Sequence, residues 1–235
     1  MTQGRIIVPE EYKPMIAQSS SAQGFMGLSA GKSLFTSSEA MKAYACFGHE
    51  KFRSFTFLIA DLPKRYNLMA LEGIDEVRAT YRTAIIGLDM RRLLKKITGN
   101  YKNVTVRNWI DFSDNEDYQK NLALLNNAYQ SDNGFSFECN SIVWGFLSLP
   151  KNLERSQRLG NSLEDRVKIC KSYVLDEFAM LLAVPKILGE DVCEIYPGKN
   201  DLQEKLQRGE FSFCDELIIN PQRKFMEAYY EPPHS

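Results

Sequence analysis

Short apolar runs alternate along the chain with longer segments in which apolar residues recur every three or four positions. The runs predict strands, because apolar residues at about four to eight successive positions are typical of strands buried in a sheet. The predicted strands are residues 5–8, 23–28, 55–60, 104–110, 141–149, 192–196 and 216–219. Residues 55–60, most of which are aromatic or branched, give the clearest of these predictions.

The periodic segments predict helices, since this spacing places apolar side chains on one face of a helix. The predicted helices are residues 37–47, 68–97, 114–129 and 162–183. Ser37 or Ser38 is suited to cap the first of them, and Ser162 the last, where Asp165 stands at the capping-box position. Pro185 is expected to lie just beyond the end of the last helix.

Strands that alternate with helices predict an α/β fold in which a mostly parallel sheet is flanked by helices. The chain of 235 residues contains no repeat, low-complexity tract or linker, and it is long enough to bury one large core. We therefore predict a single domain over residues 1–235. The tail from about residue 221 is expected to be loosely ordered.

Composition is that of a soluble globular protein, with 44% hydrophobic and 25% charged residues. No apolar run has the length of a signal peptide core or a membrane span, so we expect a cytoplasmic protein that does not bind membranes. The five cysteines are odd in number and lack a C-x-x-C pair, which favours reduced thiols and no metal site. His49 and His234 are the only histidines, so a serine nucleophile is expected to pass its proton to another kind of group.

Positive charge is concentrated between residues 78 and 102. Seven basic residues against one acid, Asp89, give this segment a charge of +6, although the whole chain has a net charge of −1. On the helix predicted there, the basic side chains avoid the apolar stripe that contains Ala79 and Met90. They are Arg78, Arg82, Arg92 and Lys96 on one face, with Arg91 and Lys95 beside them. Such a patch is typical of a surface that binds the phosphates of a nucleic acid.

Residues 24–35 contain a glycine-rich turn between an apolar run and a helix, a position where anions or acyl groups can be held. Two interpretations are open. Residues 31–33 end like a Walker A phosphate loop, although that motif requires glycine where Met26 stands, and Asp61 after the next strand resembles a magnesium-binding acid. The other interpretation is that the turn presents Ser29 as a nucleophile.

The helix predicted from Ser162 carries a second candidate group. Tyr173 and Glu177 are four residues apart and therefore adjacent on the helix surface. Glu177 borders the apolar stripe, where a carboxylate is poorly hydrated and suited to accept a proton. The alternative is a glutamate that reaches water beside a half-buried tyrosine.

Several of these motifs match one known family in order and spacing. They are Gly27-Leu28-Ser29-Ala30-Gly31-Lys32-Ser33-Leu34-Phe35, Asp61-Leu62-Pro63 with Tyr66-Asn67, the basic helix, Tyr173-x-x-x-Glu177 and Tyr196-Pro197. Over about residues 24–197 the chain resembles the cyclodipeptide synthases, in the branch with Tyr-Pro in the late motif. The resemblance implies a Rossmann-like fold similar to the catalytic domain of class I tyrosyl- and tryptophanyl-tRNA synthetases. It also implies an aminoacyltransferase that joins the amino acids of two aminoacyl-tRNAs into a cyclic dipeptide, a 2,5-diketopiperazine.

The resemblance also implies roles for single residues. Ser29 is expected to be the nucleophile that carries an aminoacyl and then a dipeptidyl group in a ping-pong reaction. Tyr173 and Glu177 are expected to hold the α-amine, and Tyr196 to relay protons during ring closure. The implied substrate-binding residues are Gly27, Lys32, Tyr118 and Pro197, of which Lys32 replaces an asparagine of the other branch. The tRNA-binding residues are expected to be Arg78, Arg82, Arg91, Arg92, Lys95 and Lys96.

This reaction needs no cofactor or metal, because an aminoacyl ester on tRNA is already activated. The expected partners are two aminoacyl-tRNAs, and the enzyme is expected to be a monomer that serves secondary metabolism. Two other functions stay open from the residues alone. One is a P-loop-like nucleotide hydrolase or kinase. The other is an RNA-binding module without catalysis, which would use the basic helix and would not need Ser29.

Overall fold

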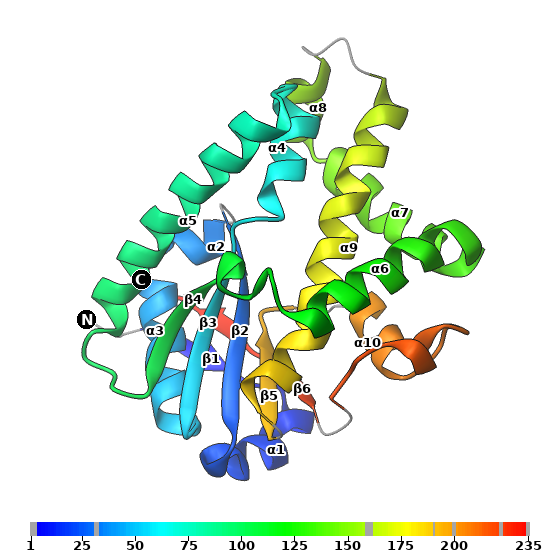
Figure 1. Cartoon of the computed structure of the whole chain (residues 1–235). Helices are drawn as coiled ribbons and strands as arrows, with labels where there is room; N and C mark the ends of the chain where they lie inside the picture. Colours follow the sequence, from blue (N-terminus) through cyan, green and yellow to red (C-terminus); the bar gives the residue numbers. More distant parts are fainter. Residues whose placement is uncertain are drawn as a thin grey trace.

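A five-stranded parallel sheet forms the centre of the protein (Figure 1). The computed structural model describes residues 4–30, 33–157, 162–189, 191–198, 201–220 and 223–233. The strands of the sheet, in the order β4-β3-β2-β5-β6, are β4 Val104–Asn108, β3 Ser54–Ala60, β2 Gln23–Ser29, β5 Val192–Tyr196 and β6 Lys224–Glu227. Two further strands, β1 Arg5–Ile7 and β7 Tyr229–Glu231, pair antiparallel in a separate small sheet. The predicted α/β fold with a mostly parallel sheet is confirmed.

The strand order reverses beside β2. The chain moves outward from β2 to β3 and β4, and β5 and β6 then fill the opposite side of β2. In an open parallel sheet, such a reversal leaves a crevice outside the carboxyl ends of the strands on either side of it. Here those ends are Ser29 of β2 and Tyr196 of β5.

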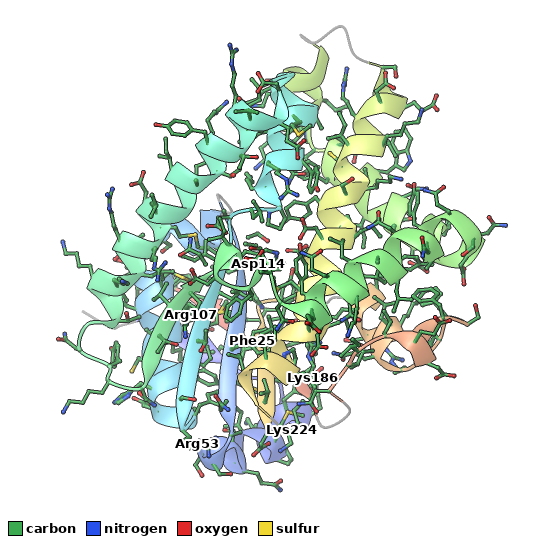
Figure 2. All side chains as sticks on the ribbon, viewed as in Figure 1. Phe25, Arg53, Arg107, Asp114, Lys186 and Lys224 are labelled. Atoms are coloured by element: carbon green, nitrogen blue, oxygen red, sulfur yellow. The ribbon has the colours of Figure 1, made fainter. Side chains whose placement is uncertain are left out.

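Helices cover both faces of the sheet (Figure 1). The described helices are α1 Lys13–Ala17, α2 Ser33–Thr36, α3 Ser38–Lys51, α4 Lys64–Glu72, α5 Glu76–Thr98, α6 Glu116–Ser131, α7 Asn133–Leu147, α8 Pro150–Gln157, α9 Leu163–Leu188 and α10 Asp201–Gln207. Two buried clusters follow from the alternation of side chains along β2. Phe25 packs with α6, α7 and α9, whereas Met26 and Leu28 pack with α3 and α5. Side chains fill the space on both sides of the sheet, with Phe25 near its centre (Figure 2).

The predicted helix caps are confirmed at two positions. Ser37 precedes α3 and its side chain accepts a hydrogen bond from the backbone N–H of Ala40. Ser162 precedes α9 and its hydroxyl accepts from the N–H of Asp165 at 3.1 Å. These bonds satisfy N–H groups that the first turn of a helix leaves without a partner.

The single helix predicted over residues 68–97 is wrong, because the structure divides it into α4 and α5. Gly73 ends α4 with a left-handed φ of 64°, a conformation that glycine adopts without steric cost. Asp75 then caps α5 by accepting from the N–H of Arg78 at 2.9 Å. The glycine that ends α4 and the aspartate that begins α5 lie within three residues, and together they outweigh the apolar periodicity that continues through both helices.

The strand predicted over residues 141–149 is also wrong, since these residues belong mainly to α7. A continuous apolar run does not by itself distinguish a strand from a buried helix. In α7 the buried residues are Phe135, Cys139, Val143 and Leu147, at intervals of four. The helical period is therefore present, but it begins before the run.

The end of the chain differs from the prediction in three respects. Residues 216–219 form no strand, and a short 3-10 helix, Cys214–Glu216, stands at their start. Pro185 lies inside α9, which continues to Leu188. The tail expected to be loosely ordered contributes β6, which pairs with β5 from Cys193 opposite Lys224 to Tyr196 opposite Glu227. The tail is held because its backbone completes an edge of the sheet.

Candidate active site

Ser29 lies at the carboxyl edge of the central sheet. It is the last residue of β2 and stands opposite Ala60, the last residue of β3. Apolar residues before it anchor the strand, since Phe25, Met26 and Leu28 are fully buried. The side chain of Ser29 is thus presented at the end of a rigid element.

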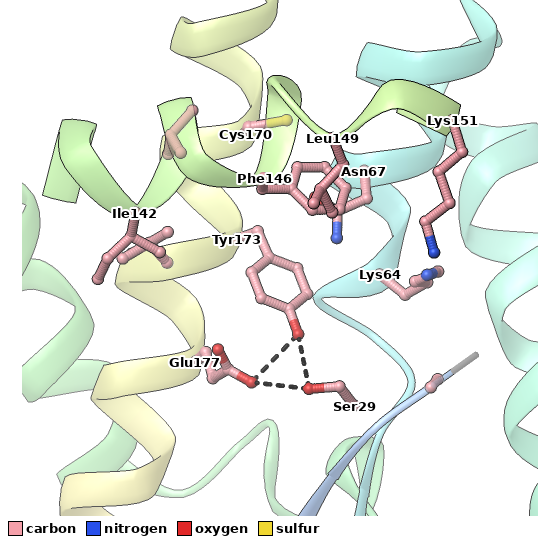
Figure 3. A pocket seen from close by; sticks show the side chains of 13 residues that line it. Ser29, Lys64, Asn67, Ile142, Phe146, Leu149, Lys151, Cys170, Tyr173 and Glu177 are labelled. Atoms are coloured by element: carbon pink, nitrogen blue, oxygen red, sulfur yellow. Dashed lines mark hydrogen bonds between the residues drawn. The ribbon is translucent and has the colours of Figure 1, made fainter. Parts of the chain in front are cut away.

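Helix α9 brings Tyr173 and Glu177 to Ser29 (Figure 3). The Ser29 hydroxyl donates to Oε1 of Glu177 at 3.4 Å. The Tyr173 hydroxyl lies 3.3 Å from Oγ of Ser29 and 3.1 Å from Oε1 of Glu177. The three side chains therefore form a closed triangle of a hydroxyl, a phenol and a carboxylate.

The electrostatics keep the phenols of this site protonated. Burial raises the pKa of Tyr173 well above its usual value, and the charge of Glu177 raises it further. Burial, followed by the charge of Glu177, also raises the pKa of Tyr196 to about 12. Both tyrosines are consequently neutral at neutral pH and act as hydrogen-bond donors.

A cavity of about 330 Å³ opens beside the triangle. One wall is apolar and comes from α7, α9 and the residues after α7: Ile142, Val143, Phe146, Leu149, Cys170 and Val174. Polar side chains line the rest, with Asn67 and Lys64 of α4, and Lys151 of α8 (Figure 3). The site can therefore hold a molecule that combines an apolar group with polar or charged parts.

The described residues contain no set of side chains that could bind a metal ion. Throughout that part of the chain, no three side chains of His, Cys, Asp and Glu are grouped so that they could hold a metal ion. Asp61, which resembled a magnesium ligand, is buried and accepts from Nδ2 of Asn108 at 2.6 Å and from the N–H groups of Trp109 and Leu62. A Cβ on Gly87 of α5 would lie 2.5 Å from Oδ2 of Asp61, so glycine permits this close approach. Asp61 thus joins β3, β4 and α5.

A buried network on the other side of α9 was not predicted from the sequence. Asp176 precedes Glu177 but is 1% exposed, and its Oδ1 accepts from the hydroxyl of Tyr118 at 2.7 Å and from Nε1 of Trp109 at 3.2 Å. Arg65 of α4 lies 3.5 Å from Oδ2 of Asp176. No sequence signal marked this network, because Asp176 stands opposite the apolar stripe of the predicted helix, where an acid is expected to be exposed.

Four other predicted site residues are described by the structure and do not line the cavity. Tyr118 belongs to the network just described, which differs from the expectation that it lines the substrate pocket. Gly27 stands in β2 against α9, where a Cβ would be 3.3 Å from Leu181, and neither it nor Pro197 lines the cavity. Tyr196 also does not line it, although the charge of Glu177 affects its pKa. Lys32 falls outside the described residues.

The basic helix α5 is more balanced in charge than its sequence suggests. Arg78 pairs with Asp75, Arg92 with Asp89, Arg91 with Asp111, and Arg82 with Glu72 of α4. Most of these acids come from outside the segment in which the basic residues were counted. Arg78 and Arg92 nevertheless remain 77% and 78% exposed, so they are available to a phosphate backbone. Exposed pairs of this kind contribute little to stability.

Comparison with protein families gives one match. The sequence matches the family described as cyclodipeptide synthase over residues 16–217. Comparison with curated proteins finds no match.

The five cysteines are free, and none of the described helices is long and apolar enough to cross a membrane.

Solved structures of the same fold extend over nearly the whole chain. A cyclodipeptide synthase from Fluoribacter dumoffii has a TM-score of 0.80 at 13% identity, with 98% of this chain and 99% of that one covered. One from Candidatus Glomeribacter gigasporarum, bound to Phe-tRNAPhe, has a TM-score of 0.70 at 15% identity, with 95% and 94% covered. Tyrosyl-tRNA synthetase from Pyrococcus horikoshii has a TM-score of 0.54 at 12% identity, with 97% of this chain and 56% of that one covered. The expected likeness to class I synthetases is confirmed at the level of the fold.

Proposed function

Because the chain belongs to the cyclodipeptide synthase family, a family of aminoacyl-tRNA-dependent transferases, we propose that it forms a cyclic dipeptide from two aminoacyl-tRNAs through Ser29. The observation that supports this most directly is the triangle of Ser29, Tyr173 and Glu177 at the edge of a cavity. The family membership favours this function over a nucleotide hydrolase and over a non-catalytic RNA-binding module. Since the substrates are charged tRNAs, the reaction is placed in the cytoplasm.

In the first step, Oγ of Ser29 attacks the ester carbonyl of an aminoacyl-tRNA. The bond from Oγ to the acyl carbon forms, and the bond from that carbon to the ribose oxygen breaks. Glu177 is within reach of the Ser29 proton at 3.4 Å and can pass it to the departing ribose oxygen. Tyr173, kept neutral by its raised pKa, donates a hydrogen bond and orients the carboxylate.

In the second step, the amine of the aminoacyl group on Ser29 attacks the ester of a second aminoacyl-tRNA. A peptide bond forms, the second tRNA leaves with a proton, and Ser29 then carries a dipeptide. The amine must first lose a proton from its ammonium form, and Glu177 is the carboxylate nearest to Ser29 in the described hydrogen-bond network. Charge attraction between the ammonium and Glu177 would also hold the amine in place.

Ring closure follows when the free amine of the dipeptide attacks the Ser29 ester. This second amide bond releases the cyclic product and returns the proton to Oγ. We assign Tyr196 and Pro197 to the Tyr-Pro branch of the family, with Tyr196 as a proton relay in this step. Its neutral phenol, with a pKa raised to about 12, can donate to the serine oxygen while it accepts a proton from the amine.

The cavity favours an aminoacyl group with an apolar side chain. Its wall from α7 and α9 consists of aliphatic and aromatic groups, and burial of an apolar side chain there stabilises the complex by about 25 cal/mol per Å². A charged side chain would lose hydration without a partner on that wall. Substitution of Phe146 should consequently change which amino acids are used.

The tRNA is proposed to bind along α5, through phosphate contacts with Arg78, Arg82, Arg91, Arg92, Lys95 and Lys96. Replacement of Arg78, Arg82, Arg92 and Lys96 by glutamate should weaken tRNA binding, and the affinity of the wild type should fall as salt is raised. An affinity that neither salt nor the four replacements change would contradict this part of the proposal.

The proposed function is tested with the purified protein and charged tRNAs. The wild type should release cyclic dipeptides that mass spectrometry identifies, and radiolabelled aminoacyl-tRNA should leave a covalent label on the protein. Ser29→Ala should give neither product nor label while it unfolds at the same temperature as the wild type. Equal labelling of both proteins would contradict the assignment of Ser29.

A further inference from the structure

A second group of cations lies at the cavity and is distinct from the exposed face of α5. Lys64, the first residue of α4, and Lys151, in the first turn of α8, both line the cavity. Their amines lie on the same side of it, opposite Glu177 (Figure 3). Arg155 follows one turn after Lys151 on α8. We call Lys64, Lys151 and Arg155 the rim cluster.

Neighbouring acids balance only part of the charge of the rim cluster. Glu72 of α4 is the acid that acts on it, and Glu72 is already shared between Arg82 and Arg155. Neither Lys64 nor Lys151 forms an ion pair with any acid in the described part of the chain. Burial lowers the pKa of Lys64, and the charges of Lys151 and Arg155 lower it further.

Such a cluster is costly without an anion, because like charges are held together in a partly desolvated place. A bound anion would reverse this cost by pairing with both amines. Two exposed lysines elsewhere in the protein stand instead beside a carboxylate on the same helix, Lys120 with Glu116 and Lys168 with Glu164. The rim cluster is therefore arranged for an anion that the chain itself does not supply.

The neighbouring nucleophile indicates which anion this is. Ser29 lines the same cavity as both lysines. When an aminoacyl ester is placed at Ser29, the nearest negative charge of the substrate is the phosphodiester that joins the terminal adenosine to the rest of the tRNA. Arg82 and Arg155 share Glu72, so the positive surface also continues from the rim cluster to α5, along which we place the acceptor arm.

We propose that Lys64 and Lys151 bind the last phosphodiester of the aminoacyl-tRNA and so position the ester at Ser29. This inference rests on the proposed function and adds to it a contact for the end of the substrate. The two lysines act on binding and do not take part in proton transfer. Their removal should therefore weaken substrate binding while the chemical steps of the bound complex are preserved.

The test is a double-mutant cycle between the protein and the tRNA. Lys64→Met with Lys151→Met is compared with the wild type, on aminoacyl-tRNA and on the same aminoacyl-tRNA whose last phosphodiester is an uncharged methylphosphonate. For the wild type, the methylphosphonate should raise KM about tenfold, and the double variant should raise KM by a similar factor on natural tRNA. For the double variant, the methylphosphonate should raise KM by less than a further factor of about two, because the contact is already lost.

Two further double variants of this protein serve as controls. Lys13→Met with Lys120→Met removes two exposed lysines of α1 and α6 and should leave KM unchanged. Lys64→Arg with Lys151→Arg retains both charges and should keep KM within about threefold of the wild type. Thermal unfolding of every variant shows whether the fold is retained.

Each result bears on a different part of the proposal. If the factor in KM from replacing the two lysines and the factor from the methylphosphonate multiply when both changes are combined, the lysines do not contact that phosphodiester and the inference is wrong. A fall in kcat at unchanged KM would make Lys64 a proton-transfer group and would equally overturn it. If the wild type forms no cyclic dipeptide from natural aminoacyl-tRNA, the proposed function itself fails.

Discussion

Asp176 and Glu177 are adjacent on α9, yet they belong to two different regions of the molecule. A step of one residue turns the side chain by about 100° around a helix. Glu177 faces the cavity and contacts Ser29 and Tyr173. Asp176 faces the core and contacts Tyr118, Trp109 and Arg65. Two carboxylates of similar chemistry therefore serve the site and the fold respectively.

The difference between the two carboxylates lies in the surroundings of their partners. The partners of Asp176 come from α4, from α6 and from the turn after β4, and all of them are buried or largely buried. The partners of Glu177 stand beside a cavity into which a substrate can enter. The buried network joins α9 to α4, α6 and the turn after β4, so the geometry on its other face is maintained without any contribution from the reacting groups.

The largest effect is expected on the cavity side. Glu177→Gln keeps the size of the side chain but removes its charge and its ability to accept a proton. Product formation should fall about 10²- to 10³-fold, whereas the thermal unfolding temperature should stay the same. Glu177 handles one proton in the first transfer but must also deprotonate the ammonium before the second, so the second transfer should slow more and aminoacyl-enzyme should accumulate. Intact-protein mass spectrometry measures this species, and wild-type rates of product formation would show that another group deprotonates the amine.

The next largest effect is expected on the core side. Asp176→Ala leaves the buried hydroxyl of Tyr118 and the N–H of Trp109 without an acceptor and Arg65 without its buried partner. The free energy of unfolding should fall by about 3 kcal/mol. Denaturant titration measures the loss, and the folded fraction should still form product. A loss of activity without a loss of stability would place Asp176 in the reaction instead.

A smaller effect is expected for Tyr118→Phe. This change removes one hydrogen bond to Asp176 and retains the packing of the ring in the core. The free energy of unfolding should fall by about 1 to 2 kcal/mol, with little change in the amino acids that are used. If the variant instead changes substrate choice at unchanged stability, Tyr118 belongs to the substrate pocket, as its sequence resemblance suggested.

The smallest effect is a dependence of stability on pH. Burial, the largest cause, raises the pKa of Asp176, although Tyr118, Arg65 and Trp109 oppose the shift. Because the folded protein binds this proton more tightly than the unfolded chain, Asp176 favours folding most below the unfolded pKa of about 4. The stability of the wild type relative to Asp176→Asn should decrease as pH rises from there through the raised pKa. Denaturant titrations of both proteins, from the unfolded pKa of about 4 upward, measure this difference in stability. A difference that instead increases with pH would show that the ion pair with Arg65 outweighs burial.

The sequence by itself determined the fold class and much of the chemistry. Local periodicity identified β2, β3 and α9, and cap residues located the beginnings of α3 and α9, because these signals act within a few residues. Family motifs pointed to Ser29, Tyr173 and Glu177, which the structure brings together. Periodicity was wrong at Gly73, where cap residues outweighed it, and in α7 an apolar run was interpreted as a strand although the helical period is present.

Only the tertiary structure decided which residues share a surface. Ser29 and Glu177 are 148 positions apart, and the bond between them depends on how α9 packs across the end of β2. The same holds for Asp176 with its partners from three elements, for the acids that neutralise α5, and for Lys64 beside Lys151. Local sequence rules reach about one helical turn, whereas these contacts depend on the packing of whole helices on the sheet. That packing places one carboxylate of α9 in the core and the next one at the nucleophile.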